Sequence, residues 1–143
     1  MKDEFITSLT DSPDPADSLA VRAGLEAFDA AHGVPADWIP LGIFVKDAAG
    51  RVVAGLSGGT YWGWLYVIRL WVDESLRGQG YGGRLLVQAE QEALRRGCHA
   101  VHLDTLDFQA LPFYQRHGYT VFGQLVDCPP GHTRTFVQKE LAA

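Results

Sequence analysis

The spacing of hydrophobic residues changes along the first half of the chain, and each change predicts a different element. Residues 14–33 carry apolar residues at helical spacing (Leu19, Ala23, Ala27 and Ala30) and end at Gly33, which predicts an amphipathic helix. Before it, residues 4–9 have the composition of a short strand. Residues 41–60 form two apolar runs around Asp47 to Gly50, which predicts a β-hairpin whose glycine supplies the positive φ of the turn.

The second half continues this alternation of strands and helices. Residues 62–72 are rich in aromatic and β-branched residues and predict a buried central strand. A helix follows, with Leu85, Leu86, Ala89 and Ala93 on its apolar face and Gly97 in the C′ position. Further strands are expected at residues 99–106, 119–126 and 133–141, with a short helix at 110–118. Without repeats or linkers, the order β, α, β, β, β, α, β, α, β, β predicts one domain over residues 1–143.

Composition and charge exclude several classes of protein. Apolar residues make up 47% and charged residues 20%, as in ordinary globular proteins. The net charge of −5 is scattered and no basic stripe accompanies the aromatic residues, so we expect no nucleic-acid partner. We see neither a signal-peptide core nor an apolar run near the ~20 residues of a membrane span, so we expect a cytoplasmic protein without membrane contact. Cys98 and Cys128 lack metal-ligand spacing and predict free buried thiols and no metal site.

The stretch "LRGQGYGGRLL", residues 76–86, has two interpretations. Gly78, Gly80 and Gly83 fit the dinucleotide pattern G-x-G-x-x-G, with Asp104 where a ribose-binding acid would stand. However, residues 73–77 separate the expected strand end from the first glycine, whereas the dinucleotide turn is tight. The three-strand meander before the loop also does not suit a doubly wound sheet. A nicotinamide oxidoreductase is therefore the remote alternative.

In the second interpretation, the backbone amides from Arg77 to Gly82 form a cradle for a pyrophosphate at a helix N-terminus. The helix dipole and Arg77 would neutralise the diphosphate without a metal. Here the chain resembles the GNAT superfamily of N-acyltransferases, whose signature R/Q-x-x-G-x-G/A binds the pyrophosphate of coenzyme A. A second block, "ALPFYQRHGY" with Tyr114, Gly118 and Tyr119, is similar to the family's helix after its fifth strand.

The resemblance implies an α/β fold of the α+β type: a mixed, mostly antiparallel sheet flanked by helices, with a splayed pair of central strands. It also implies an acetyl-CoA-dependent N-acetyltransferase that moves the acetyl group directly to a primary amine in a ternary complex. The acceptor would be a small-molecule or protein amine, and a homodimer is a further expectation. The fourth strand carries no carboxylate before Asp73, which leaves open a non-catalytic acyl-CoA-binding or protein-interaction module on the same fold.

The resemblance also assigns cofactor-binding positions. They are the backbone groups at the end of the fourth strand (Leu70, Trp71 and Val72) and the pyrophosphate loop (Arg77, Gly78, Gln79, Gly80, Tyr81 and Gly82). A backbone N–H aimed at the thioester oxygen would stabilise the oxyanion that forms when an amine attacks. These assignments depend on backbone position and not on side-chain type.

Tyr114 corresponds to the tyrosine that often protonates the departing thiolate in the family. A phenol with a pKa near about 10 stays protonated at neutral pH, while the thiolate of a thiol near about 8.5 accepts the proton. Asp104 is the candidate general base, with His132 as the alternative. Asp107 replaces the family's usual asparagine and could equally cap the following helix, so it is not assigned to the cofactor.

The aromatic residues Trp62, Trp64 and Tyr66 alternate along the predicted central strand. Alternation places them on one face, where they could line an acceptor pocket. Aromatic faces of central strands are more often core, so we expect core packing.

Overall fold

The computed structural model describes residues 4–142, which divide after Ala36 into two units. The first unit contains helix α1 (Pro15–Ala31), which Asp14 caps by accepting a 2.9 Å hydrogen bond from the amide of Ala16. Gly33 follows at φ +79°, so the predicted helix is confirmed. Residues 4–10 have no regular structure, and the strand expected at residues 4–9 is wrong. A strand needs a hydrogen-bonded neighbour, and residues 4–36 contain no other strand. The single domain over residues 1–143 stays a prediction.

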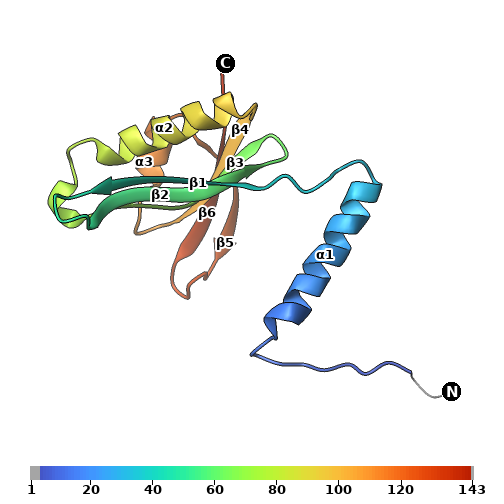
Figure 1. Cartoon of the computed structure of the whole chain (residues 1–143). Helices are drawn as coiled ribbons and strands as arrows, with labels where there is room; N and C mark the ends of the chain where they lie inside the picture. Colours follow the sequence, from blue (N-terminus) through green and yellow to red (C-terminus); the bar gives the residue numbers. More distant parts are fainter. Residues whose placement is uncertain (1–3, 143) are drawn as a thin grey trace. The chain divides into compact units, whose positions relative to one another are not determined.

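The second unit is a six-stranded sheet with helices (Figure 1). In chain order its elements are β1 (Ile39–Lys46), β2 (Val52–Tyr61), β3 (Trp64–Val72), the short 3-10 helix η1 (Glu74–Leu76), α2 (Tyr81–Arg95), β4 (Ala100–Leu106), α3 (Leu111–Arg116), β5 (Thr120–Val126) and β6 (Thr133–Glu140). The strands lie in the order β1-β2-β3-β4-β6-β5, and every pair is antiparallel except β3–β4. This confirms the mixed, mostly antiparallel sheet and is not the order of a doubly wound dinucleotide fold.

The hydrophobic core lies between the sheet and α2, with α3 at its edge. The predicted apolar face of α2 is buried, and it meets alternate residues of the central strands (Leu65 and Val67 of β3, Val101 and Leu103 of β4). Burying one such side chain contributes about 1.5–3 kcal/mol, so this layer holds α2 on the sheet. Full burial of β3 was expected, but Ile68, Arg69 and Trp71 are exposed. The reason is that helices cover only one face of this sheet within the second unit.

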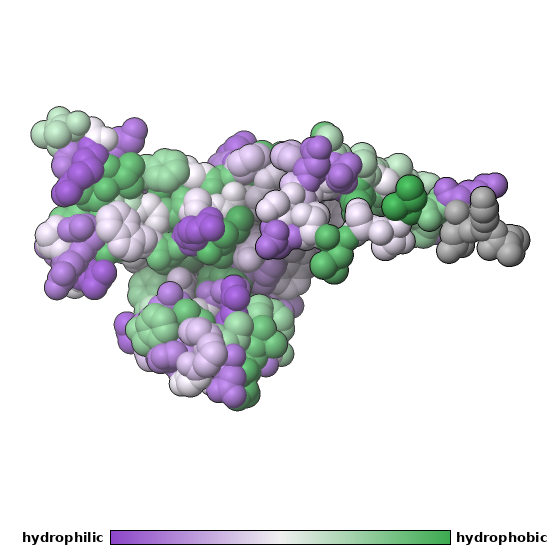
Figure 2. Space-filling model, turned by 90° about the horizontal axis from the view of Figure 1, so that it is seen from below, coloured by the Kyte–Doolittle hydropathy of each residue, from purple (hydrophilic) through white to green (hydrophobic). Residues whose placement is uncertain are grey.

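The surface combines hydrophobic and hydrophilic residues. Figure 2 shows the two kinds interspersed over the face seen from below. On β5, the exposed apolar residues are Val121, Phe122, Leu125 and Val126. None of the helices in the described part of the chain is long and apolar enough to cross a membrane.

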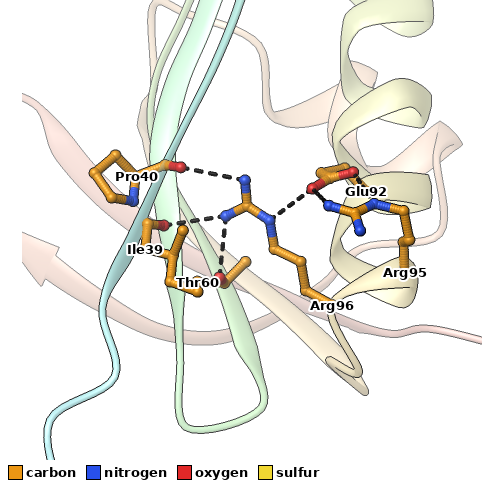
Figure 3. Close-up of polar contacts among 6 residues, drawn as sticks. All are labelled: Ile39, Pro40, Thr60, Glu92, Arg95 and Arg96. Carbon is orange, nitrogen blue, oxygen red and sulfur yellow. Dashed lines mark hydrogen bonds and ion pairs between the residues drawn. The ribbon is translucent and has the colours of Figure 1, made fainter.

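Arg96, at the C-terminal end of α2, ties the helix to the first two strands (Figure 3). Its guanidinium donates to the carbonyls of Ile39 and Pro40 at 3.1 and 3.2 Å, and to Thr60 Oγ1 at 3.2 Å. It also pairs at 2.7 Å with Glu92, which stands four residues earlier on the same helix face. Only 17% of its side chain is exposed, so these acceptors depend on it.

We expect Arg96→Lys to lower the free energy of unfolding by about 2 kcal/mol, because one ammonium cannot reach all these acceptors. Arg95→Lys is the matched control: Arg95 also pairs with Glu92, but 72% of its side chain is exposed. The control should lose less than about 0.5 kcal/mol. Urea unfolding of both variants measures this difference, and equal losses would contradict the role given to Arg96.

Candidate functional site

The centre of the sheet opens where β3 and β4 separate. These parallel strands pair only from Trp64 to Tyr66 on β3 and from Ala100 to His102 on β4. Beyond this point β3 stays paired with β2 up to Val72, while β4 pairs with β6. The facing edges of the two strands are therefore unpaired over their C-terminal halves, and their N–H and C=O groups are available to a ligand. The splayed pair expected from the resemblance is present, and Leu70, Trp71 and Val72 lie along its β3 side.

A β-bulge lies close to the separation point. The register of β2 against β3 shifts between Ser57, which faces Arg69, and Gly58, which faces Val67, so Ile68 is the extra residue. A Cβ on Gly58 would lie 2.0 Å from the carbonyl oxygen of Tyr66, so only glycine permits this close approach. The bulge bends β3 at the point where it leaves β4.

The glycine loop joins the open end of this gap to α2. Gly78 and Gly80 have φ of +76° and +84°, and a Cβ on either would meet nothing within 4 Å. Among the described residues, the amides from Gly78 to Gly83 donate to no protein acceptor, and no side chain caps α2. The Arg77 Nε donates to the carbonyl of Val72 at 3.1 Å, which ties the loop to the strand end. The arrangement is an open cradle of backbone donors at a helix N-terminus, suited to an anion.

Helix α3 brings the second motif against this cradle. An added Cβ on Gly82 would lie 3.5 Å from the Phe113 ring, and one on Gly83 would lie 3.2 Å from His117 Nε2. The first turn of α2 and α3 are thus in contact, although their motifs are far apart in the sequence. Their small residues explain how closely the two helices approach.

Tyr114 belongs to the core, yet its hydroxyl is unused. The residue is 7% exposed. Among the described residues, the hydroxyl has no hydrogen-bond partner and is not a fully buried unpaired atom, so the oxygen reaches the surface. Burial, and to a lesser degree the negative charge of Asp104, raises the pKa of Tyr114 to about 12. The phenol is therefore a protonated donor at any physiological pH.

Asp104 is held by an ion pair on the face of the sheet opposite α2. Both carboxylate oxygens accept from Nη2 of Arg134 on β6, at 3.1 and 2.9 Å. Their side chains are 20% and 40% exposed. Within the described part of the chain, Arg134 Nε is the buried side-chain donor left without a hydrogen bond. The pair places a partly exposed carboxylate on this face of the sheet.

Asp107 and His132 join two loops and do not meet Asp104 in any contact of the described residues. His132 Nδ1 lies 2.8 Å from Oδ1 of Asp107, and the amide of Thr133 donates to Oδ2 at 3.0 Å. Hydrogen bonding to His132, followed by that to Thr133, lowers the pKa of Asp107. The capping role considered for Asp107 is wrong: Ala110 is the N-cap of α3, and no side chain caps it. The Asp107 carboxylate is instead hydrogen-bonded to His132 and Thr133, at the end of the loop between β5 and β6.

An aromatic cluster lies at the separation point, on the same face as Asp104. Trp64 and Tyr66 alternate with the buried residues of β3, so they face away from α2, whereas Trp62 lies in the turn before β3 at φ +49°. Neither Trp64 nor Tyr66 belongs to the hydrophobic core, so the expected core packing of this face is wrong. Both rings instead contact His102 of β4, Tyr66 by stacking at 4.6 Å between ring centroids.

His102 is the residue of this site that sequence reasoning missed. Its Nε2 lies 2.8 Å from the hydroxyl of Tyr61 on β2. Burial lowers the pKa of His102, and the charge of Asp104 opposes this shift more weakly. Burial also raises the pKa of Tyr61. The available signal was its place in "HAVHLDTL", where it alternates with the apolar residues that face the core.

The described residues contain no group of three or more His, Cys, Asp or Glu side chains placed to hold a metal. Both cysteines are free. Cys98 is buried as expected, but the expected burial of Cys128 is wrong, because it is half-buried.

Comparisons with known proteins give a consistent result. The chain matches the model of the acetyltransferase (GNAT) family over residues 10–119. It is 38% identical to an acetyltransferase of Agrobacterium fabrum over 131 residues, which cover 92% of this chain and 96% of that protein. It is 42% identical to the blasticidin-S acetyltransferase of Streptomyces morookaense over 106 residues, 71% of this chain and 78% of that protein.

A solved structure is similar over nearly the whole chain. A crystal structure from Agrobacterium tumefaciens, described as an acetyltransferase, has a TM-score of 0.88 and 37% identity to this chain. The similarity covers 95% of this chain and 99% of that one.

Proposed function

The chain belongs to the acetyltransferase (GNAT) family, and from that membership we propose that it transfers the acetyl group of acetyl-CoA directly to a primary amine of a small molecule. The observation that carries this proposal is that the glycine cradle contacts α3, the helix that carries Tyr114, whose hydroxyl has no hydrogen-bond partner among the described residues. An acyltransferase needs both an anchor for the cofactor and a proton donor for its leaving thiolate.

The residues present fit coenzyme A. The cradle from Gly78 to Gly83 offers consecutive backbone amides at the positive end of α2, where a pyrophosphate would be neutralised without a metal. Leu70, Trp71 and Val72 would line the pantetheine arm at the open end of β3, with Leu70 and Val72 presenting their backbone groups along the unpaired edge. One of their amides would donate to the thioester oxygen as negative charge develops there. When bound, acetyl-CoA supplies an activated acyl carbon and a leaving thiolate.

Tyr114 would donate its hydroxyl proton to that thiolate. Its raised pKa keeps the donor form populated throughout the physiological range. Asp104, held by Arg134, lies on the face of the sheet opposite α2 and would draw an ammonium group toward the gap. Of the two bases considered from the sequence, Asp104 is the stronger candidate for taking the ammonium proton, because His132 is bound to Asp107.

The proposal that the acceptor is a small-molecule amine is supported by a relative of this chain. The blasticidin-S acetyltransferase, 42% identical to this chain, acts on a small molecule according to its name. The aromatic cluster of Trp64 and Tyr66 would suit a planar or cationic acceptor, since aromatic faces bind both. We therefore place small-molecule amines ahead of protein amines.

Calorimetric titration with acetyl-CoA, with NADH as control, tests the cofactor. Binding of acetyl-CoA in the micromolar range and none of NADH is expected. An acetylation assay with small amines, blasticidin S and a lysine peptide then tests the acceptor class. Absence of acetyl-CoA binding by folded protein, or acetylation of the peptide alone, would contradict the proposal.

We expect Gly80→Ala to weaken acetyl-CoA binding by about tenfold or more. The added methyl group would enter the cradle, and alanine is strained in the left-handed conformation that Gly80 adopts. Gly97→Ala is the matched control, since Gly97 has φ +85° at the other end of α2 and equally open surroundings. Both variants should lose about 1 kcal/mol of stability. Only Gly80→Ala should change the dissociation constant for acetyl-CoA in calorimetry; equal binding by both variants would exclude the loop as the cradle.

A further inference from the structure

We propose that His102 removes the proton from the acceptor ammonium, and that Tyr61 positions its imidazole for this step. The inference rests on the proposed function and names a proton acceptor other than Asp104 or His132. It starts from the place of His102 in the sheet. His102 is the last residue of β4 that pairs with β3, so it lies at the vertex of the gap.

The vertex is the end of the gap that the acyl group must approach. The cradle joins the opposite, open end, next to Val72. A pantetheine arm anchored in the cradle therefore enters the gap from its open end and extends toward Tyr66 and His102. On the other face, α2 and the core close the sheet, so within the second unit the amine would attack from the face that carries His102.

Side chains from β3 and from β2, the strand beyond it, contact the imidazole. Tyr66 of β3 stacks on it with an interplanar angle of 13°, and Trp64 meets it edge-on at 5.8 Å. Tyr61 of β2 contacts Nε2 at 2.8 Å. Nδ1 has no hydrogen-bond partner among the described residues. If Nε2 donates its proton to the Tyr61 oxygen, Nδ1 is the basic nitrogen and is free to accept a proton.

Asp104 and Arg134 play a different part. Asp104 lies two residues from His102 on the same face, and both of its oxygens are already hydrogen-bonded to Arg134. Gln138, opposite His102 on β6, is uncharged. Among the described residues, the other ionisable side chains in ring or hydrogen-bond contact with the imidazole are Tyr61 and Tyr66. A neutral imidazole in this setting is the better proton acceptor, and Asp104 supplies charge that attracts the ammonium.

The proton balance closes with the groups named. The ammonium gives one proton to Nδ1 of His102, and the free amine nitrogen forms a bond to the acyl carbon. The C–S bond breaks, its electron pair stays on sulfur, and Tyr114 protonates the thiolate. A second N–H proton from the amine restores Tyr114, while the imidazolium returns the first proton to water.

The test compares His102→Gln with His99→Gln. His99 also contacts the Trp64 ring, at 5.5 Å, but lies outside β4 and is exposed, so it controls for the loss of a histidine in this cluster. With an alkyl amine, His102→Gln should lower kcat about a hundredfold, the usual scale of general-base catalysis, and His99→Gln should not. Acetyl-CoA affinity, measured by calorimetry, should be unchanged in both variants.

A weakly basic acceptor provides the decisive readout. An arylamine or hydrazine that is already neutral at the assay pH has no ammonium proton to lose. The defect of His102→Gln should therefore shrink to within about tenfold, since base catalysis of deprotonation is no longer needed. Tyr61→Phe should show a smaller defect that follows the same dependence on the amine, because it disturbs only the tautomer. The acid limb of the wild-type kcat profile, expected below the usual histidine pKa of about 6.5, should disappear in His102→Gln.

The outcomes separate the two levels of inference. Equal defects of His102→Gln with both amines, or no defect, would overturn the role of His102 while leaving the acetyltransferase proposal standing. A wild-type protein that binds no acetyl-CoA and acetylates neither amine would overturn the proposed function, and this inference with it.

Discussion

Tyr114→Phe is expected to lower kcat about a hundredfold, with acetyl-CoA affinity and stability nearly unchanged. Removing a positioned general acid typically costs about 10²–10⁴ in rate, and we expect the lower end because the thiolate is also a good leaving group. Stability should hold because the hydroxyl makes no hydrogen bond within the described residues. Steady-state kinetics with a primary amine measures the change in kcat, and calorimetry the affinity.

Tyr119→Phe is the matched control. Tyr119 contacts Tyr114 edge-on at 5.8 Å between ring centroids, but its hydroxyl donates to Glu90 at 2.7 Å. Its loss should cost about 1–2 kcal/mol of stability and leave kcat intact. The same substitution at neighbouring rings thus separates catalysis from folding. A Tyr114→Phe protein with wild-type kcat would remove Tyr114 from the chemistry.

The raised pKa of Tyr114 also predicts how the rate depends on pH in the alkaline range. The donor form exists below the pKa, so a pKa of about 12 moves its loss two units above the usual value of about 10. The wild-type rate should therefore show no alkaline decline due to Tyr114 between pH 8 and roughly 11. A decline centred near about 10 would indicate an exposed, ordinary phenol instead.

Glu90→Ala is expected to lower the free energy of unfolding by about 3 kcal/mol, because it leaves the partly buried ammonium of Lys139 without its carboxylate partner. Glu90 is 8% exposed on α2, where it accepts from the Tyr119 hydroxyl and pairs with Lys139 of β6 at 3.0 Å. The lysine side chain is only 26% exposed. Burial first, and then hydrogen bonding to Glu90, raise the pKa of Tyr119, so that phenol stays neutral beside the carboxylate.

The double variant Glu90→Leu with Lys139→Met tests the cause. Replacing both charges by apolar groups should recover most of the loss, since no ion then remains unpaired. Urea unfolding of the wild type and of the single and double variants measures the coupling. If Glu90→Ala lost less than about 1 kcal/mol, the pair would be acting as an exposed one.

Much of the local structure follows from the sequence. The helical spacing of Leu85, Leu86, Ala89 and Ala93 predicts which face of α2 is buried. Gly97 marks the end of this helix, because it has a positive φ that few other residues adopt. The glycines of the Arg77 loop likewise predicted an open backbone cradle. Such signals are local, because they depend on φ, ψ and the burial period of nearby residues.

The site itself needed the tertiary structure. Tyr61 and His102 are 41 positions apart, and only the register of β2, β3 and β4 brings them together. In the same way, the pairing of β4 with β6 brings Arg134 to Asp104. Asp107 is hydrogen-bonded to His132 in the loop between β5 and β6, and it does not cap α3. The strand expected at residues 4–9 failed for the related reason that a strand exists only with a partner. Local sequence patterns therefore predicted the helices, the strands of the second unit and the open glycine loop, because these depend on local backbone and burial. Tertiary structure decided which polar side chains face one another, because strand order and register join residues that no local pattern connects.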